Sequence, residues 1–282
     1  MITIVIPTYN NLEYLKLCIN SIKKNSKNKF KIILHINEGN DGTLEYASEN
    51  NIEYTFSIRN IGLCTSLNKA CKLVKTKYIL YSHDDMYFCP GWDEALLDEL
   101  KNMNDIFFYL SGTMIEPEAG HIQFNCGKDI NSFNEKKLLE NYKNLPYYDH
   151  QGSHFAPHLI HKDVWDKIGG LSEEFNPGMC SDPDLNMKLW NAGVRVFKGI
   201  NDFRVYHFGS LTTRRKKNLI QNKGHYTFLK KWKITHKFFI KYYLRSQNIF
   251  DGPLREPNKN FFYFIGLLVC KIKLLFLLIK NV

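Results

Sequence analysis

Cysteine is sparse and irregularly placed in this chain of 282 residues. The 7 cysteines are odd in number and include no C-x-x-C pair, so neither a zinc site nor a disulfide framework is expected, and a reducing cytoplasm is the expected compartment. No basic leader precedes the first apolar residues, so no signal peptide is expected. The fingerprints G-x-G-x-x-G and G-x-x-x-x-G-K-[ST] are also missing, so side chains and a metal would have to bind any nucleotide.

Acidic side chains are nearly missing from one part of the chain. Residues 211–282 hold 16 Lys and Arg but only 2 Asp and Glu. Residues 1–210 hold 22 Lys and Arg and 26 Asp and Glu. The formal net charge of +10 therefore comes from a basic tail of net charge +14, and the body is mildly acidic at −4. Hydrophobic residues make up 44% of the chain, which excludes wholesale disorder.

Long apolar runs are also missing. The longest, counting Gly266, is Phe261 to Cys270, and the apolar residues after it are interrupted by Lys271 and Lys273. Because a membrane span needs about 20 apolar residues, this segment predicts a helix that lies in the interface of an anionic membrane. The alternative is a helix docked on the domain or on a second copy of the chain, as in a homo-oligomer. A nucleic-acid partner is not expected, because the lysine stems lie beside long aliphatic stretches.

The hydrophobic pattern of the body alternates between strand and helix periods. Strands are expected at 2–6, 30–36, 52–58, 78–81, 106–115, 121–124, 194–197 and 203–207, and helices at 11–24, 63–74, 93–100, 163–168 and 183–191, with a short helix from Thr43. This order predicts an α/β fold with a mostly parallel sheet flanked by helices. Ligands bind such sheets beyond the carboxyl ends of the strands. Three polar loops fall there: 7–10, 37–41 and 83–85.

Three short motifs carry candidate chemistry. Asp84 and Asp85 follow His83 at the end of a strand, where grouped carboxylates indicate Mg²⁺ or Mn²⁺, or else two solvated loop aspartates. Asp182, before a helix, is a candidate general base or an ordinary N-cap. His207 lies at the end of a strand and is either a metal ligand or a structural histidine. The basic run 214–217 that follows it would either close over a diphosphate or form a solvated loop.

Five segments together resemble family 2 glycosyltransferases with the A-type nucleotide-sugar-binding fold. They are TIVIPTYN at 3–10, NEGNDGT at 37–43, RNIG at 59–62 with Asn68, YILYSHDD at 78–85 with PGW at 90–92, and GGLSEEF at 169–175 with DPDL at 182–185. Their order and spacing cover about 200 residues. The resemblance implies a nucleotide-sugar-binding half at 1–110, an acceptor-binding half of the same catalytic domain at 111–210, and a basic, partly apolar helical tail at 211–282.

The resemblance also implies a role for each matching residue. The residues expected along the nucleotide-sugar are Pro7, Thr8, Tyr9, Glu38, Asn60, Gly62 and Asp84. Asp85 and His207 would bind the divalent metal that bridges the diphosphate, and Asp182 would be the base.

Three positions depart from the family pattern. His83 stands where the first acidic residue of the metal motif is expected, and Ser181 stands where an acidic residue precedes the base. Asp184 is therefore an alternative base. The loop at 37–41 is one residue short, so Asn37 is an alternative to Glu38.

The implied activity is an inverting, metal-dependent transfer of a sugar from a nucleotide-diphosphate sugar to a hydroxyl of a growing surface glycan or glycolipid, such as lipopolysaccharide or capsule. The expected location is peripheral, on the cytoplasmic face of the cell membrane. The alternatives are a sugar nucleotidyltransferase on a similar fold and a catalytically silent nucleotide-sugar-binding assembly subunit.

A chain that ends before Asn260 is expected to lose its binding to anionic liposomes, because it lacks the apolar segment, and to keep activity on a soluble acceptor. Liposome flotation beside a transfer assay measures both. Undiminished flotation of the shortened chain would show that this segment is not the anchor.

Overall fold

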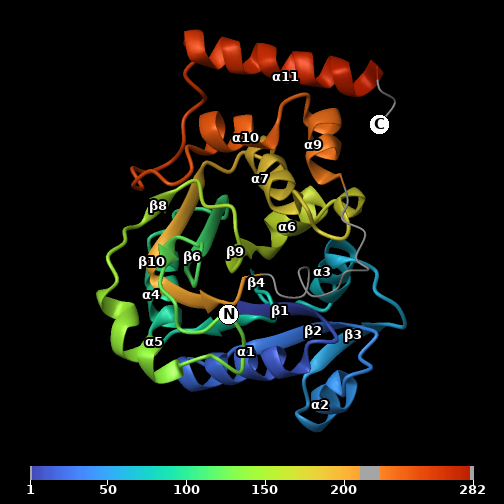
Figure 1. Ribbon diagram of the computed structural model, residues 1–282, viewed down its shortest axis with the longest axis vertical. Helices are drawn as coiled ribbons and strands as arrows, with labels where there is room; N and C mark the ends of the chain where they lie inside the picture. The colour runs from blue at the N-terminus through green and yellow to red at the C-terminus, as the bar shows by residue number, and fades with distance from the viewer. Residues whose placement is uncertain (1, 210–222, 280–282) are drawn as a thin grey trace.

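The computed structural model describes residues 2–209 and 223–279. A twisted sheet forms the centre of the molecule, helices cover it on both sides, and a long C-terminal helix lies across one end (Figure 1). The predicted α/β class and the helical C-terminal extension are both confirmed.

The strands are β1 (Ile2–Tyr9), β2 (Lys31–Asn37), β3 (Glu53–Ser57), β4 (Tyr78–Tyr81), β5 (Met86–Phe88), β6 (Phe108–Glu116), β7 (Ile122–Gln123), β8 (His150–Gln151), β9 (His158–His161) and β10 (Val196–His207). The helices are α1 (Leu12–Asn25), α2 (Thr43–Glu49), α3 (Leu63–Cys71), α4 (Trp92–Lys101), α5 (Glu135–Asn141), α6 (Lys162–Ile168), α7 (Ser181–Asn191), α9 (Gly224–Trp232), α10 (His236–Phe239) and α11 (Phe261–Ile279). Short turns of other helix types are η1 (Tyr142–Asn144), η2 (Glu173–Phe175) and η3 (Ile240–Leu244).

The sheet has ten strands, with the order β3-β2-β1-β4-β9-β6-β10-β5 and with β7 and β8 at its margins. The strands β3, β2, β1 and β4 are parallel, so their carboxyl ends meet at one edge. In the second half β9 runs antiparallel between β4 and β6, while β6 and β10 are parallel. The sheet continues from the first half of the body into the second without a break.

Two strands differ from the expected boundaries. β1 continues to Tyr9 instead of stopping at Pro7, because its pairing with β4 ends at Val5 and only β2 lies beside it farther on. A proline, which has no N–H to donate, is tolerated where one neighbour is missing. The two short strands expected at 194–197 and 203–207 form one strand, β10, whose register shifts between Ile200 and Arg204.

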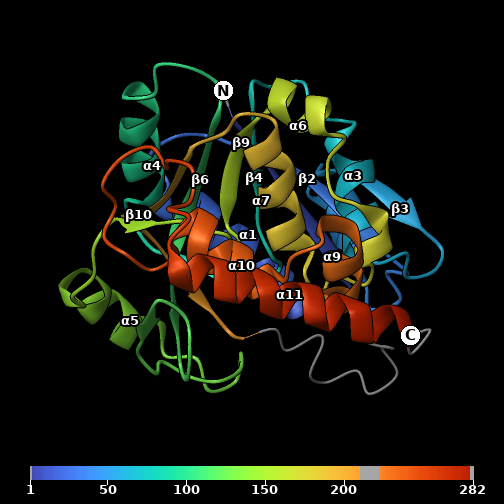
Figure 2. The same ribbon diagram turned by 90° about the horizontal axis from the view of Figure 1, so that it is seen from above.

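The described part of the tail folds back on the body. α11 packs on α9 and α10, and α10 packs on α7 (Figures 1 and 2). Asp184 of α7 is fully buried, accepts a hydrogen bond of 2.8 Å from Trp232 Nε1 and forms an ion pair of 3.0 Å with Lys231 Nζ. Lys231 also pairs with Glu174 at 3.0 Å. This buried carboxylate therefore fastens the basic tail to the body.

Asp184→Ala is expected to lower the free energy of unfolding by about 2–4 kcal/mol, because it removes a buried ion pair and leaves Lys231 and Trp232 without their shared acceptor. Urea denaturation measures the change. The control Asp166→Ala removes a more exposed partner of Lys162 and should shift stability by no more than about 0.5 kcal/mol. Equal losses in the two variants would contradict the role of Asp184.

Candidate functional site

The predicted meeting of three polar loops is confirmed at the carboxyl edge of β1, β2 and β4. Thr8 Oγ1 at the end of β1 donates a hydrogen bond of 2.7 Å to Asp84 Oδ2. Asn37 Nδ2 at the end of β2 donates to the Thr8 carbonyl oxygen at 3.3 Å. Because the three strands are parallel and in register, these side chains reach one another across about 75 residues of sequence.

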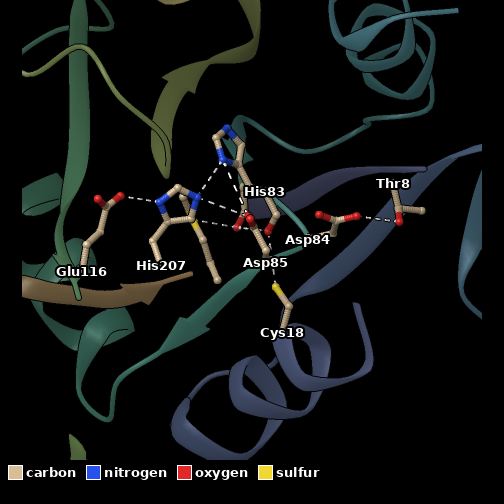
Figure 3. Close-up of polar contacts among 9 residues, drawn as sticks. Thr8, Cys18, His83, Asp84, Asp85, Glu116 and His207 are labelled. Carbon is tan, nitrogen blue, oxygen red and sulfur yellow. Dashed lines mark hydrogen bonds and ion pairs between the residues drawn. The ribbon is translucent and has the colours of Figure 1, made fainter. Parts of the chain in front are cut away.

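His83, Asp85 and His207 form a compact cluster at this edge (Figure 3). β10 ends at His207, which places its Nε2 atom 3.3 Å from Asp85 Oδ1 and 3.5 Å from His83 Nδ1. His83 Nδ1 lies 3.9 Å from the same carboxylate oxygen. One nitrogen or oxygen atom from each of the three residues lies within 4.8 Å of the others, so together they offer a ligand set for a metal ion.

Glu116 fixes the orientation of His207 from the other side. Its Oε1 atom lies 2.6 Å from His207 Nδ1, which directs Nε2 toward Asp85. Burial opposes charge on this imidazole, but Asp85 and Glu116 outweigh it and raise the pKa of His207 to about 10. A carboxylate behind a ligating imidazole is the usual partner in metal sites, where it sets the tautomer and strengthens the ligand.

The two neighbouring aspartates are held in different states. Burial and the negative charge of Asp85 raise the pKa of Asp84. Burial alone would also raise the pKa of Asp85, but the positive imidazole of His207 lowers it. Asp85 is therefore the ionised member of the pair, which is the state that a metal ligand needs.

The donor set fits a divalent cation. Two imidazole nitrogens and one carboxylate oxygen suit Mn²⁺ or another transition metal better than Mg²⁺, which prefers an all-oxygen shell. His83 thus belongs to the candidate site, although it stands where the family pattern has an acidic residue. Glu116 was not predicted. The signal available for it was an acidic residue, followed by Pro117, at the end of an apolar strand.

Tyr9 and Glu38 are neighbours at the ends of β1 and β2. Burial and the charge and hydrogen bond of Glu38 raise the pKa of the Tyr9 phenol. Glu38 is half-buried and accepts a hydrogen bond of 3.2 Å from Asn10. Asn37 is buried and already bonded to Thr8, Ser57, Ser66 and the Ile61 backbone, so it has no free capacity for a ligand. Of the two alternatives, Glu38 is the one left to face a nucleotide.

Three of the predicted nucleotide-binding positions have a structural role in the fold. Pro7 is a buried strand residue paired with His35. Asn60 Oδ1 accepts a hydrogen bond of 2.9 Å from the Gly62 N–H. Gly62 has a φ of 81°, and a Cβ atom there would lie 2.4 Å from the Asn176 side chain, so the site needs glycine for packing alone. A nucleotide contact at these positions stays a prediction.

Asp182 and Asp184 lie in the first turn of α7 but in different surroundings. Helix α7 begins at Ser181 with Cys180 before it, so the N-cap interpretation of Asp182 is wrong. Asp184 is buried against the tail, as described above, whereas Asp182 is half-buried, and burial raises its pKa to about 7. Of the two candidate bases, Asp184 is occupied by its contacts with Lys231 and Trp232, so Asp182 is the better candidate.

Tyr81, the last residue of β4, connects Asp182 with the metal cluster. Burial raises the pKa of its phenol, and so do the charges of Asp182, Asp84 and Asp85. The Tyr81 phenol therefore interacts electrostatically with the candidate base and with the carboxylate of the candidate metal site. The basic run 214–217, predicted to close over a diphosphate, lies outside the described residues.

The sequence model of the family described as Glycosyl transferase family 2 matches residues 3–168, which is more than half of the chain. The chain belongs to this family. The match covers Thr8, Glu38, the metal motif and Glu116, and it ends before α7 and the tail.

Two curated relatives are similar to this family 2 chain. A chondroitin synthase from Escherichia coli is 25% identical over 236 residues, which is 80% of this chain and 32% of that protein. An uncharacterized glycosyltransferase, RP339, from Rickettsia prowazekii (strain Madrid E) is 26% identical over 203 residues, 70% of this chain and 61% of that protein. The chain thus spans about a third of the first relative and under two thirds of the second.

Solved structures share the A-type fold. TarS 1–349 of S. aureus has a TM-score of 0.55 at 15% identity, covering 73% of this chain and 60% of that one. GalNAc-T7 with UDP, GalNAc and Mn²⁺ has a TM-score of 0.56 at 14% identity, covering 73% of this chain and 43% of that one. The predicted A-type glycosyltransferase fold is confirmed.

Glu116→Gln is expected to weaken the binding of Mn²⁺ by roughly 10- to 100-fold, because a neutral amide behind His207 makes the imidazole a poorer ligand. The loss of the free Mn²⁺ signal in electron paramagnetic resonance measures the affinity directly on the protein. Glu118→Gln, a change two residues away at an exposed side chain paired with Lys128, is the control and should leave the affinity unchanged. Equal affinity in both variants would remove Glu116 from the site.

Proposed function

We propose that this protein is an inverting, metal-dependent glycosyltransferase that moves a sugar from a nucleotide-diphosphate sugar to a hydroxyl of a growing surface glycan at the cytoplasmic face of the membrane. The observation that carries the proposal is the position of Tyr81: its ring lies 5.4 Å from that of His83 in the metal cluster, and its phenol interacts with the charges of both Asp85 and Asp182. An inverting transfer needs one base on the acceptor side and one cationic group at the leaving diphosphate.

Asp182 would take the proton from the acceptor hydroxyl through its carboxylate oxygen. With a pKa of about 7 it is basic enough to accept a proton, and about half of the Asp182 carboxyl groups are ionised at pH 7. No covalent intermediate is needed, because the hydroxyl itself attacks the sugar from the side opposite the leaving group.

The titratable groups around Asp182 stay neutral over the working range. Burial and nearby carboxylates raise the pKa of Cys64 to about 12 and that of Cys180 to about 11. Burial also raises the phenol pKa values of Tyr81 and Tyr109. Among these neighbours, Asp182 is therefore the group that changes charge near pH 7.

His83, Asp85 and His207 would hold the cation, with Glu116 orienting His207. When bound, a divalent cation offsets the negative charge that develops on the departing diphosphate. Tyr9 and Glu38 would lie along the nucleoside, while Thr8 fixes Asp84 at the sugar end. The solved neighbours include TarS in complex with UDP and with UDP-GlcNAc, which makes uridine-diphosphate sugars the first donor class to assay.

The proposed membrane location rests on α11. This helix has 19 residues with a mean hydropathy of 2.3 over its best 18-residue window, so by length and composition alone it could cross a membrane. It lies flat on the body in Figures 1 and 2 and buries one stripe, formed by Tyr263, Cys270 and Leu277. That packing favours a helix in the membrane plane, because a spanning helix would have to leave the body.

The outward half of α11 is apolar throughout. The exposed side chains on it are Phe261, Phe264, Ile265, Leu268, Val269, Ile272, Leu275, Phe276 and Ile279. With about 100° per residue, Lys271 and Lys273 fall on the two opposite flanks, about 100° and about 60° from Cys270 at the middle of the buried stripe. Lysines on both flanks would reach the lipid phosphates while the apolar face enters the hydrocarbon.

Asp182→Asn is expected to reduce sugar transfer by roughly 10²- to 10⁴-fold, because it removes the general base. The wild-type rate should fall about tenfold per pH unit below pH 7 and level off above it, since protonated Asp182 cannot accept a proton. Release of UDP from UDP-sugars in the presence of Mn²⁺ and an acceptor, measured from pH 5.5 to 8.5, tests both.

Asp163→Asn, at an exposed residue outside the site, is the control and should keep the wild-type profile. Asp85→Ala should also abolish transfer, by removing a metal ligand. Full activity in Asp182→Asn and in Asp85→Ala would overturn the assignment, and release of pyrophosphate from a nucleoside triphosphate would point to a nucleotidyltransferase.

A further inference from the structure

A cavity of about 740 Å³ lies between α11 and the start of α7. Lys273, Phe276 and Leu277 of α11 line one side, and Met179 and Cys180, directly before α7, line another. The remaining lining residues are His225, Tyr226 and Leu229 of α9 and Thr235, His236 and Lys237 at the start of α10. This volume lies in the range of small-molecule sites, so the cavity is large enough for part of a substrate.

One portion of the cavity is cationic. His225, His236, Lys237 and Lys273 all line it, and burial together with the charges of Lys237, His225 and Lys273 lowers the pKa of His236. Within the described residues, none of the lining side chains is acidic, and neither lysine has a carboxylate within 4.0 Å. His236 Nδ1 is buried and lacks a hydrogen-bond partner there. Such a cluster is stabilised by a bound anion with several oxygen acceptors, which is the chemistry of a phosphate.

The other portion is apolar and continuous with the outward face of α11. Leu277 and Leu229 are buried beside the cavity, while Phe276 lines it and is 60% exposed on the helix surface. An occupant that satisfies both portions is an amphiphile with an anionic head and a hydrocarbon chain. The chain would leave the cavity over Phe276 and enter the layer in which α11 is proposed to lie.

The cavity wall includes two residues that come shortly before the proposed base in the sequence, Met179 and Cys180. Cys180 is two residues before Asp182, and burial together with the Asp182 carboxylate raises the pKa of its thiol to about 11. Met179 is 41% exposed at the same place. A group attached to the head of the amphiphile on this side would reach the carboxylate that accepts the proton.

We propose that this cavity is the acceptor subsite for a lipid-anchored phosphate: Lys237, Lys273 and His236 bind the phosphate, the hydrocarbon chain runs over Phe276, and the attached sugar presents its hydroxyl to Asp182. The inference rests on the proposed function, because it takes Asp182 as the base. It specifies a membrane lipid as the carrier of the acceptor.

The experiment measures binding of monomeric dodecyl phosphate to the full-length protein by isothermal titration calorimetry, with inorganic phosphate and uncharged dodecyl maltoside as comparison probes. Dodecyl phosphate should bind at least tenfold more tightly than either. Lys273→Gln and Lys237→Gln should each weaken it roughly tenfold, because each removes one charge-assisted hydrogen bond.

Lys271→Gln is the matched control. Lys271 and Lys273 are exposed lysines on opposite flanks of α11, and of the two only Lys273 lines the cavity. Lys271→Gln should leave dodecyl phosphate binding unchanged, while flotation with phosphatidylglycerol vesicles should fall equally in Lys271→Gln and Lys273→Gln. Equal loss of dodecyl phosphate binding in these two variants would indicate adsorption to the helix and overturn the proposal.

Three other results would also overturn it. Inorganic phosphate binding as tightly as dodecyl phosphate would assign the cavity to a free anion. Dodecyl maltoside binding as tightly would make it a purely apolar groove. A dimer in sedimentation that Phe276→Glu dissociates would assign the face to a second copy of the chain. Since none of these measurements needs donor turnover, failure of the cavity proposal is distinguishable from failure of the proposed function.

Discussion

The imidazole of His207 lies between two carboxylates that come from different strands, and the geometry of the site depends on this contact. Asp85 follows β4, Glu116 ends β6, and His207 ends β10, so three distant parts of the chain meet only when the second half of the sheet is assembled. Without the positive imidazole, burial would protonate Asp85 as it favours the protonated form of Asp84. Because an imidazole binds a metal ion only in its neutral form, a cation held by Asp85 and His207 would displace the proton that His207 carries between the two carboxylates.

The first half of the fold was predictable because β1, β2 and β4 are mostly buried and its strands alternate with helices. That pattern fixes the parallel order, and the parallel order brings Thr8, Asn37 and Asp84 to one edge. The antiparallel insertion of β9 and the bulged strand β10 could not be predicted, because their register depends on distant partners. His83 and Glu116 were missed for the same reason: each becomes a site residue through the position of His207.

Two aspartates separated by one proline show how little sequence spacing says about role. Asp182 and Asp184 are both acidic residues in the first turn of α7, and residues two apart on a helix point to different sides. Asp184 points into the protein, where Lys231 offsets its charge and Trp232 donates a hydrogen bond to it, while Asp182 stays half-exposed with a raised pKa. The basic composition of the tail thus serves packing as well as surface charge.

The attachment of the tail to α7 has a geometric consequence. α10 packs on both α7 and α11, and Asp184 connects α9 to α7. The first turn of α7 is therefore held at a fixed distance from the axis of α11. For a protein that lies on a membrane through α11, this geometry would fix the distance between the lipid surface and the first turn of α7. With Asp182 as the proposed base, hydroxyls at a matching distance from the lipid surface would reach it, and the fold would select acceptors by the length of glycan already built.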